Sequence, residues 1–270
     1  MSRACIVIPA RYGSRRYPGK PLVALRGASG AARTLLERSI RAARSAAAAA
    51  GGLPVLVATD DDRIAAEAGR VGAEVVMTDT ACANGTERVA QAVTRAGIDA
   101  DIVVNLQGDA PLTPAEFVPA LIDRLTADER LAVATPVLRC DAETLANLIA
   151  DRRAGRVGAT TAVFDAAGRA LYFSKEVLPF TDGRTEVDGV VPVFHHVGLY
   201  AYRPAALRAY SGWAPAPLER LEGLEQLRFL ENGWPVACVE VAAGGAKFWE
   251  LNNPSDVPLI EGYLAAMGID

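Results

Sequence analysis

The sequence predicts an α/β protein built on a doubly wound, mostly parallel sheet. Two patterns lead to this prediction. Short runs of Val, Ile and Leu without polar alternation recur through residues 1–150, which is typical of parallel strands buried on both faces. Longer segments with helical periodicity separate these runs, so that strands and helices alternate along the chain.

In the first half, strands and helices are expected in alternating order. The strands are predicted at residues 4–9, 54–58, 73–77, 101–106 and 131–137. The helices are predicted at residues 34–49, 61–71, 86–96 and 114–126, the last beginning with a Thr113 cap and Pro114. Right-handed crossovers would place the loops after the strands at one edge of the sheet, where ligands bind in such folds.

The second half is richer in strands. Strands are predicted at residues 160–164, 170–173, 193–202 and 235–241, with turns at Asp182-Gly183 and Asp188-Gly189. Helices are predicted at residues 204–210, 217–232 and 254–267. In the second of these helices every third residue is a leucine expected to face the core: Leu218, Leu221, Leu224, Leu227 and Leu230.

No linker divides the chain, so a single domain spanning residues 1–270 is predicted. Within it, residues 1–150 would form the α/β half and residues 151–210 a smaller β-rich insertion. Residues 211–270 would add returning helices and a strand.

Composition and charge argue against several classes of protein. The formal net charge of −4 argues against a general nucleic-acid binder. No run of about 18 apolar residues is present to span a membrane, and the first residues lack a signal-peptide core. The four cysteines lie far apart, which argues against a disulfide framework and favours a reducing cytoplasm. With His195 and His196 as the two histidines, a histidine-rich metal site is excluded.

The segment at residues 8–22, IPARYGSRRYPGKPL, is the strongest candidate for a binding loop. It follows the first strand and carries four cations and two glycines, with no acidic residue: Arg11, Arg15, Arg16, Lys20, Gly13 and Gly19. Freed backbone N–H groups and fixed cations can cradle a polyphosphate. The alternative is a solvated basic loop. Neither the Walker pattern nor G-x-G-x-x-G is present.

The segment NLQGDAPL places Asp109 at the end of a buried strand. A carboxylate there can hold Mg²⁺ beside phosphate oxygens, because Mg²⁺ usually takes one or two carboxylates and leaves its other positions to water and substrate. The alternative is an aspartate that forms a turn before Pro111.

The segment NGTER at residues 84–88 opens a predicted helix. The backbone N–H groups of Gly85 and Thr86 suit a nucleobase edge or an anion. The alternative is a plain helix cap with Glu87 in the first turn.

Six segments in register resemble one known family. They are IPARYGSRRYPGKPL, NGTERVA, NLQGDAPL, ALYFSKEVLP, HHVGLYAYR and LERLEGLEQLRFLENG. Together they are similar to the 3-deoxy-manno-octulosonate (KDO) cytidylyltransferases, over residues 6–256. The resemblance implies a Rossmann-like, GT-A-like nucleotidyltransferase fold and a cytoplasmic homodimer that uses Mg²⁺. It also implies transfer of CMP from CTP to an anionic sugar acid, with release of pyrophosphate.

The resemblance also implies roles for individual residues. The residues implied to bind CTP are Ala10, Arg11, Gly13, Ser14, Asn84, Gly85, Thr86, Arg88 and Gln107. Arg16, Lys20 and Asp109 would be catalytic, and Asp109 and Asn252 would bind the metal ion. The implied acceptor-side residues, in the β-rich insertion and the helix after it, are Lys175, His196, Tyr200, Glu222, Glu225 and Gln226.

Several of these later residues also allow a purely structural interpretation. Tyr200 and Tyr202 alternate along a strand and could be packing residues, as could His195 and His196. The glutamates of the 217–232 helix could form one solvated stripe.

The sequence departs from the family pattern on the acceptor and metal side. Ala110 replaces a glutamate, Lys175 an arginine and Thr161 a lysine, while Asn252 replaces the second metal-binding aspartate. Asp256 or Glu250 could compensate for that lost charge. KDO or a related 2-keto acid sugar is the expected acceptor. A phosphonate acceptor and a non-catalytic nucleotide-binding protein remain open alternatives.

Overall fold

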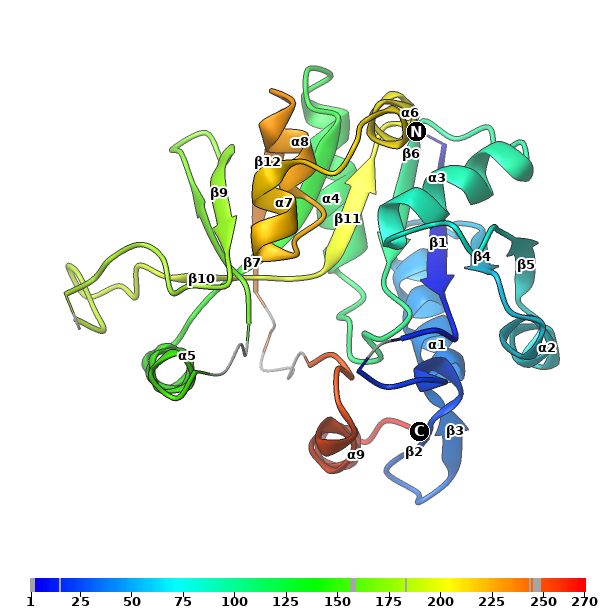
Figure 1. Cartoon of the computed structure of the whole chain (residues 1–270). Helices are drawn as coiled ribbons and strands as arrows, with labels where there is room; N and C mark the ends of the chain where they lie inside the picture. The colour runs from blue at the N-terminus through cyan, green and yellow to red at the C-terminus, as the bar shows by residue number, and fades with distance from the viewer. Residues whose placement is uncertain (1–2, 15, 156–158, 183, 243, 245–248) are drawn as a thin grey trace.

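The structure is a computed structural model that describes residues 3–14, 16–155, 159–182, 184–242, 244 and 249–270 (Figure 1). Arg15 of the basic loop and Gly183 of the first predicted turn lie outside the described residues. No helix within the described ranges is both long and apolar enough to cross a bilayer.

One large sheet forms the centre of the fold, in the strand order β5-β4-β1-β6-β11-β7-β10-β8-β9, with β12 also paired to β7. Its strands are β1 (Ala4–Ala10), β4 (Val55–Thr59), β5 (Glu74–Met77), β6 (Ile102–Leu106), β7 (Val133–Arg139), β8 (Thr161–Phe164), β9 (Ala170–Ser174), β10 (Phe194–His196), β11 (Leu199–Tyr202) and β12 (Val236–Val241). Pairing is parallel from β5 to β6 and between β7 and β12. The intervening β11 and the hairpin side, β10-β8-β9, pair antiparallel.

Helices cover both faces of this sheet (Figure 1). The helices are α1 (Leu35–Ala49), α2 (Asp62–Arg70), α3 (Gly85–Arg95), α4 (Phe117–Ala127), α5 (Ala142–Arg153), α6 (Pro204–Gly212), α7 (Pro217–Glu222), α8 (Leu227–Glu231) and α9 (Val257–Ala266). Ile6 and Ile8 of β1 share one apolar cluster with α1 and α4. Cys5 and Val7 share a second cluster with α3 and α6. Because alternate residues of β1 serve the two clusters, the expected α/β fold with a doubly covered sheet is confirmed.

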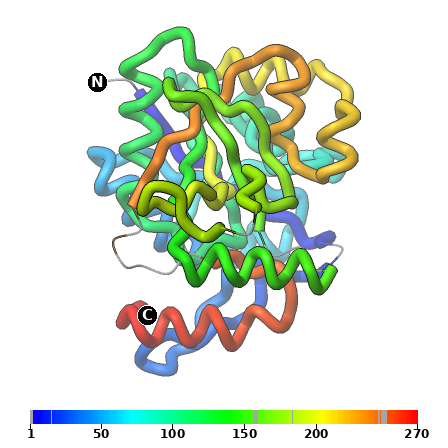
Figure 2. The backbone as a smooth tube through the Cα atoms, turned by 90° about the vertical axis from the view of Figure 1, so that its left-hand side faces the viewer, coloured from blue at the N-terminus to red at the C-terminus, as the bar shows by residue number. Residues whose placement is uncertain are grey.

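A small hairpin and the last helix form a separate apolar cluster below the sheet (Figure 2). The hairpin consists of β2 (Ala24–Arg26) and β3 (Ala32–Thr34), which the sequence analysis did not predict. Its backbone is fastened to α9, since Arg26 N donates to Glu261 Oε1 at 2.7 Å. Leu251, in the segment before α9, is buried in the same cluster.

The predicted strand at residues 193–202 is in fact two strands, β10 and β11. His196 pairs with Val137 and Ala201 pairs with Ala134. The chain therefore advances five residues from β10 to β11 while β7 advances three. The extra residues bulge at Gly198, and this bulge lets β11 lie between β6 and β7. Its position at the carboxyl edge of the parallel strands brings Gly198 close to the loop after β6.

The predicted helix at residues 217–232 is also divided. Gly223 has φ 63°, a left-handed conformation that favours glycine and ends α7. The leucine pattern is therefore wrong for the first part: Leu221 is 83% exposed and Leu218 38% exposed, whereas Leu227 in α8 is fully buried.

Two further differences are local. The helix predicted from Pro114 begins only at Phe117, after a turn in which Phe117 N donates to Pro114 O. Helix α5 was missed because it buries little apolar surface, with Leu145 and Leu148 as its buried residues. Its N-terminus is capped by Asp141, which accepts from Thr144 N at 2.7 Å.

Candidate active site

The basic loop after β1 is closed by its own backbone. Tyr12 O accepts hydrogen bonds from Ser14 N and Gly19 N, both at 2.9 Å. Gly19 has φ 72°, and a Cβ there would lie 3.2 Å from the Tyr12 ring. The Arg63 guanidinium lies over the Tyr12 ring, 3.3 Å from its centroid. The loop therefore has a defined shape and leaves Arg11, Gly13 and Arg16 exposed.

The end of this loop meets the loop after β6. Lys20 Nζ donates to Asp109 Oδ2 at 2.5 Å, and Lys20 is the more buried partner. Arg16 Nη2 donates to Asn252 Oδ1 at 2.7 Å. Leu251 N donates to Asp109 O at 2.9 Å, which fastens the C-terminal segment beside the aspartate. Three segments far apart in the sequence thus meet at the carboxyl edge of the sheet, as the topology rule predicts.

A second carboxylate, Glu250, lies in this centre. Its Oε1 is 2.7 Å from the position that a Cβ on Gly198 would occupy. Burial and the nearby charge of Asp109 raise the pKa of Glu250 to about 7, although Lys20 acts in the opposite direction. Sequence reasoning had treated Glu250 only as one of two compensating residues.

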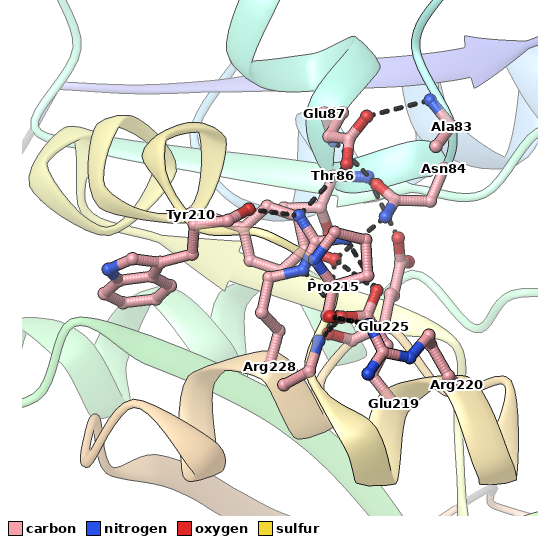
Figure 3. Close-up of polar contacts among 12 residues, drawn as sticks. Ala83, Asn84, Thr86, Glu87, Tyr210, Pro215, Glu219, Arg220, Glu225 and Arg228 are labelled. Carbon is pink, nitrogen blue, oxygen red and sulfur yellow. Dashed lines mark hydrogen bonds and ion pairs between the residues drawn. The ribbon is translucent and has the colours of Figure 1, made fainter.

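The N-terminus of α3 forms the neighbouring part of the site (Figure 3). Asn84 caps the helix by accepting from Glu87 N at 2.9 Å. Thr86 N donates to Glu225 Oε2 at 3.1 Å, and Gln107 Nε2 donates to Glu225 Oε1 at 3.4 Å. Burial raises the pKa of Glu225. Because the Glu225 carboxylate already accepts from this helix N-terminus, the carboxylate and the Gln107 amide together suit the polar edge of a nucleobase rather than a second anion.

Glycines allow these segments to approach closely. A Cβ on Gly85 would lie 3.1 Å from Gln107 Nε2. A Cβ on Gly108 would lie 2.8 Å from Pro9 O. A side chain at Gly108 would push the β6 loop away from β1, and one at Gly85 would displace the amide of Gln107.

Arg88 is turned into the protein. It is 2% exposed, and its guanidinium donates to Asp60 Oδ2 at 2.9 Å and to Thr78 Oγ1 at 2.5 Å. It thereby joins α3 to the ends of β4 and β5. Arg88 therefore holds the start of α3 in position from inside the protein.

A buried ion-pair group joins α3 to α7 and α8 (Figure 3). Arg228 is 1% exposed, and its Nη2 lies 2.6 Å from Glu219 Oε1. Its Nη1 lies 3.0 Å from Glu87 Oε1. Its guanidinium also covers the Tyr210 ring at 4.0 Å. Sequence reasoning missed Arg228, because nothing in the spacing distinguishes it from a surface arginine on a helix.

Glu225 lies against the start of α3, and the other predicted acceptor-side residues fall into two groups. His196, Tyr200 and Gln226 are buried: His196 Nε2 lies 2.9 Å from Thr135 Oγ1, and Tyr200 donates to Gln226 Oε1 at 3.1 Å. The second group lies at the end of β9, where Glu222 accepts from Lys175 N at 2.9 Å.

Lys175 extends over the turn that ends α7. Its Nζ lies 3.0 Å from the position of a Cβ on Gly223. Ser174 Oγ donates to Glu222 Oε1 at 2.7 Å, so both oxygens of this glutamate hold the β9 end in place. The glycine leaves the ammonium group of Lys175 room to lie across the break between α7 and α8.

The sequence is similar to proteins of known activity. A family profile described as cytidylyltransferase matches residues 5–241. The 3-deoxy-manno-octulosonate cytidylyltransferase of Maricaulis maris is 45% identical, over 97% of this chain and 97% of its own length. The chain belongs to the KDO cytidylyltransferase family. The corresponding protein of Chlamydia pneumoniae is 36% identical, over 97% of this chain and 94% of its own.

Solved structures agree with the family assignment. A CMP:2-keto-3-deoxy-manno-octonic acid synthetase complexed with CTP matches with a TM-score of 0.81 and 30% identity, over 98% of this chain and 100% of its own. A putative glucose-1-phosphate thymidylyltransferase from Bacillus anthracis, at 11% identity and a TM-score of 0.61, shares the fold. This cytidylyltransferase is therefore a nucleotidyltransferase, as the sequence analysis predicts.

The buried histidine of this cytidylyltransferase gives a testable dependence of stability on pH. Burial, with a smaller effect of His195, lowers the pKa of His196 to about 3. Between about pH 6.5 and that value, the unfolded chain binds a proton at this residue and the folded chain does not. Acidification through this range therefore lowers the free energy of unfolding, by about 1.4 kcal/mol per pH unit for one such group.

We expect His196→Gln to remove this contribution. The drop in the free energy of unfolding between about pH 7 and pH 5, measured with urea, should be smaller in the variant by about 2 kcal/mol. Comparing each protein with itself at the two pH values removes the effect of the lost hydrogen bond to Thr135. If the two proteins show equal drops in the free energy of unfolding, His196 has the same pKa in the folded protein as in the unfolded chain.

Proposed function

We propose that this cytidylyltransferase transfers CMP from CTP to KDO or a closely related 2-keto acid sugar and releases pyrophosphate. The meeting of Lys20, Arg16 and Asp109 at the carboxyl edge of the sheet carries the proposal. A hydroxyl oxygen of the acceptor attacks the α-phosphorus, the bond to the β-phosphate oxygen breaks, and pyrophosphate leaves with that electron pair. The hydroxyl proton passes to water.

The basic loop would bind the triphosphate. Arg11, Ser14 and Arg16 lie beside the backbone hydrogen bonds that Ser14 N and Gly19 N donate to Tyr12 O, and these bonds limit the conformational entropy lost on binding. Lys20 and Arg16 would stabilise the charge that develops on the leaving pyrophosphate. Gly13 and Ala10 lack bulky side chains and allow the phosphates and ribose to approach the backbone closely.

The nucleoside would lie against the start of α3. Asn84, Gly85 and Thr86 form this helix N-terminus, and the Gln107 amide lies across from them. Arg88 would contribute by holding this turn in place, given its pairing with Asp60.

The residues present fit a magnesium ion. Asp109 and Glu250 supply hard oxygen donors, and no cluster of three or more His, Cys, Asp or Glu side chains suited to a metal ion occurs in the described part of the chain. A site with few carboxylates, completed by phosphate oxygens and water, is the kind that Mg²⁺ favours. Bound there, Mg²⁺ would neutralise phosphate charge and make the acceptor hydroxyl more acidic.

The acceptor would lie between the end of β9 and α8. Lys175 is the cation available for its carboxylate, and Glu222 and Glu225 can accept bonds from its hydroxyl groups. His196, Tyr200 and Gln226 would form the wall behind it.

We further propose a cytoplasmic homodimer. The β-rich insertion presents large exposed apolar side chains, with Leu171 64% and Phe180 86% exposed, which favours a protein contact there. The four cysteines are free and buried, in keeping with a reducing compartment.

A substrate panel tests this function. Pyrophosphate release should be measured with CTP, MgCl₂ and each of KDO, other 2-keto acid sugars and several phosphonates. Turnover with KDO or a 2-keto acid sugar supports the proposal. Turnover with phosphonates alone, or CTP binding measured by calorimetry without any turnover, would overturn it.

A further inference from the structure

The proposed magnesium site has little net negative charge if Asp109 is its only carboxylate. Asp109 is neutralised by Lys20 at 2.5 Å, so the pair alone offers little attraction to a divalent cation. Asn252, beside it, carries no charge. Two further carboxylates lie within four residues of Asn252, namely Glu250 and Asp256. The structure distinguishes between them.

Asp256 is occupied as a cap. Its Oδ2 accepts from Asn252 N at 2.8 Å and from Asn253 N at 2.7 Å. These bonds satisfy the free N–H groups at the start of the 3₁₀ turn Pro254–Asp256. To reach Asp109, the carboxylate would have to give up both bonds.

Asn252 is occupied as well. Its Oδ1 accepts from Arg16 Nη2 at 2.7 Å, across 236 residues of sequence. The amide thus holds the exposed guanidinium of the basic loop. An aspartate at this position would form an ion pair with Arg16, and an asparagine instead leaves the arginine's charge available for phosphate.

Glu250 is directed into the centre. Its Oε1 lies 2.7 Å from the Cβ position of Gly198, and Gln107 Cγ lies 3.8 Å from that same position. The absence of a side chain at the β10–β11 bulge provides the room for the carboxylate. The backbone bond from Leu251 N to Asp109 O, at 2.9 Å, keeps Glu250 next to the aspartate.

We propose that Glu250, together with Asp109, supplies the carboxylates of the magnesium site, and that Asn252 serves to hold Arg16. This inference rests on the proposed function, because it assumes a metal-assisted transfer at this edge of the sheet. It places the second acid two residues earlier in the chain than Asn252. The site then carries two carboxylates against one ammonium group, which leaves a net negative charge for the cation.

Metal binding can be measured without turnover. Mn²⁺ is titrated into the full-length protein, and free Mn²⁺ is followed by electron paramagnetic resonance. Glu250→Gln should weaken Mn²⁺ binding by about tenfold or more, the size of loss typical when a metal site is disturbed. Glu250→Asp should recover part of it. The matched control is Glu129→Gln, an exposed glutamate in the turn before β7, which should bind Mn²⁺ as the unmodified protein does.

Two further variants separate the roles. Gly198→Ala keeps every charge but displaces Glu250, so it should also weaken Mn²⁺ binding, and circular dichroism would verify that it folds. Asn252→Ala should weaken Mn²⁺ binding less than Glu250→Gln does, because it removes a hydrogen bond to Glu250 but no proposed ligand, and it should raise KM for CTP through Arg16.

The outcomes separate this inference from the proposed function. Wild-type Mn²⁺ affinity in Glu250→Gln, or a larger loss of Mn²⁺ affinity in Asn252→Ala than in Glu250→Gln, overturns the assignment of Glu250 even if KDO is a substrate. Failure of KDO as a substrate, with the expected Mn²⁺ pattern intact, overturns the acceptor and leaves the assignment of Glu250 supported.

Discussion

Asp109→Ala is expected to lower the rate of CMP transfer by about a hundredfold or more, the loss of at least about 3 kcal/mol of transition-state stabilisation. The aspartate follows β6, lies at the junction of three segments and holds Lys20 Nζ at 2.5 Å. Its removal takes away a proposed metal ligand and frees Lys20 from its partner. The measurement is pyrophosphate release at saturating CTP, MgCl₂ and KDO.

The control for this variant is Asp123→Ala, which removes an exposed carboxylate from α4 on the surface of the protein. It should transfer CMP at the unmodified rate. Circular dichroism should show that both variants are folded. Near-normal turnover by folded Asp109→Ala would mean that neither the metal nor Lys20 depends on this aspartate.

The parallel half of the fold could be predicted because its signals are local. Residues 4–9 form one apolar run that is buried on both faces, and such a run is readable without knowing its neighbours. The Asn84 cap and its helix are equally local, because Asn84 binds an amide three residues away. Three of the six motifs that carried the family resemblance, those beginning at residues 8, 84 and 105, lie in or beside these segments.

The breaks in the second half could not be predicted from periodicity. Leucines at every third position continue through Gly223, yet the glycine takes a left-handed conformation and the leucines before it face solvent. The bulge at Gly198 follows from the insertion of β11 between β6 and β7, which is a property of the whole sheet. Such long-range choices override local pattern.

The metal centre shows the same limit at the level of single residues. The replacement of an aspartate by Asn252 is visible in the sequence, but the partner of its amide, Arg16, is 236 residues away. The choice between Glu250 and Asp256 depends on where each carboxylate lies: Asp256 caps the 3₁₀ turn by accepting from Asn252 N and Asn253 N, whereas Glu250 lies close enough to Asp109 for their charges to interact.

Arg228→Met is expected to lower the free energy of unfolding by about 3–5 kcal/mol, the usual cost of leaving buried charges without their partner. Glu219, at 10% side-chain exposure, would lose both of its bonds to the guanidinium, and Glu87 would lose one. The cation over the Tyr210 ring would also be lost. Urea unfolding at pH 7 measures the change. Because Glu87 lies in the first turn of α3, the variant should also raise KM for CTP.

Two comparisons decide whether buried charge is the cause. Arg208→Met removes an exposed arginine from α6 and should change the free energy of unfolding by less than about 0.5 kcal/mol. Adding Glu219→Gln to Arg228→Met should restore part of the lost stability, because the amide leaves no uncompensated charge inside the protein. If the double variant is less stable than Arg228→Met by the full effect of a second independent substitution, then packing of the arginine, and not its charge, holds α3 against α7 and α8.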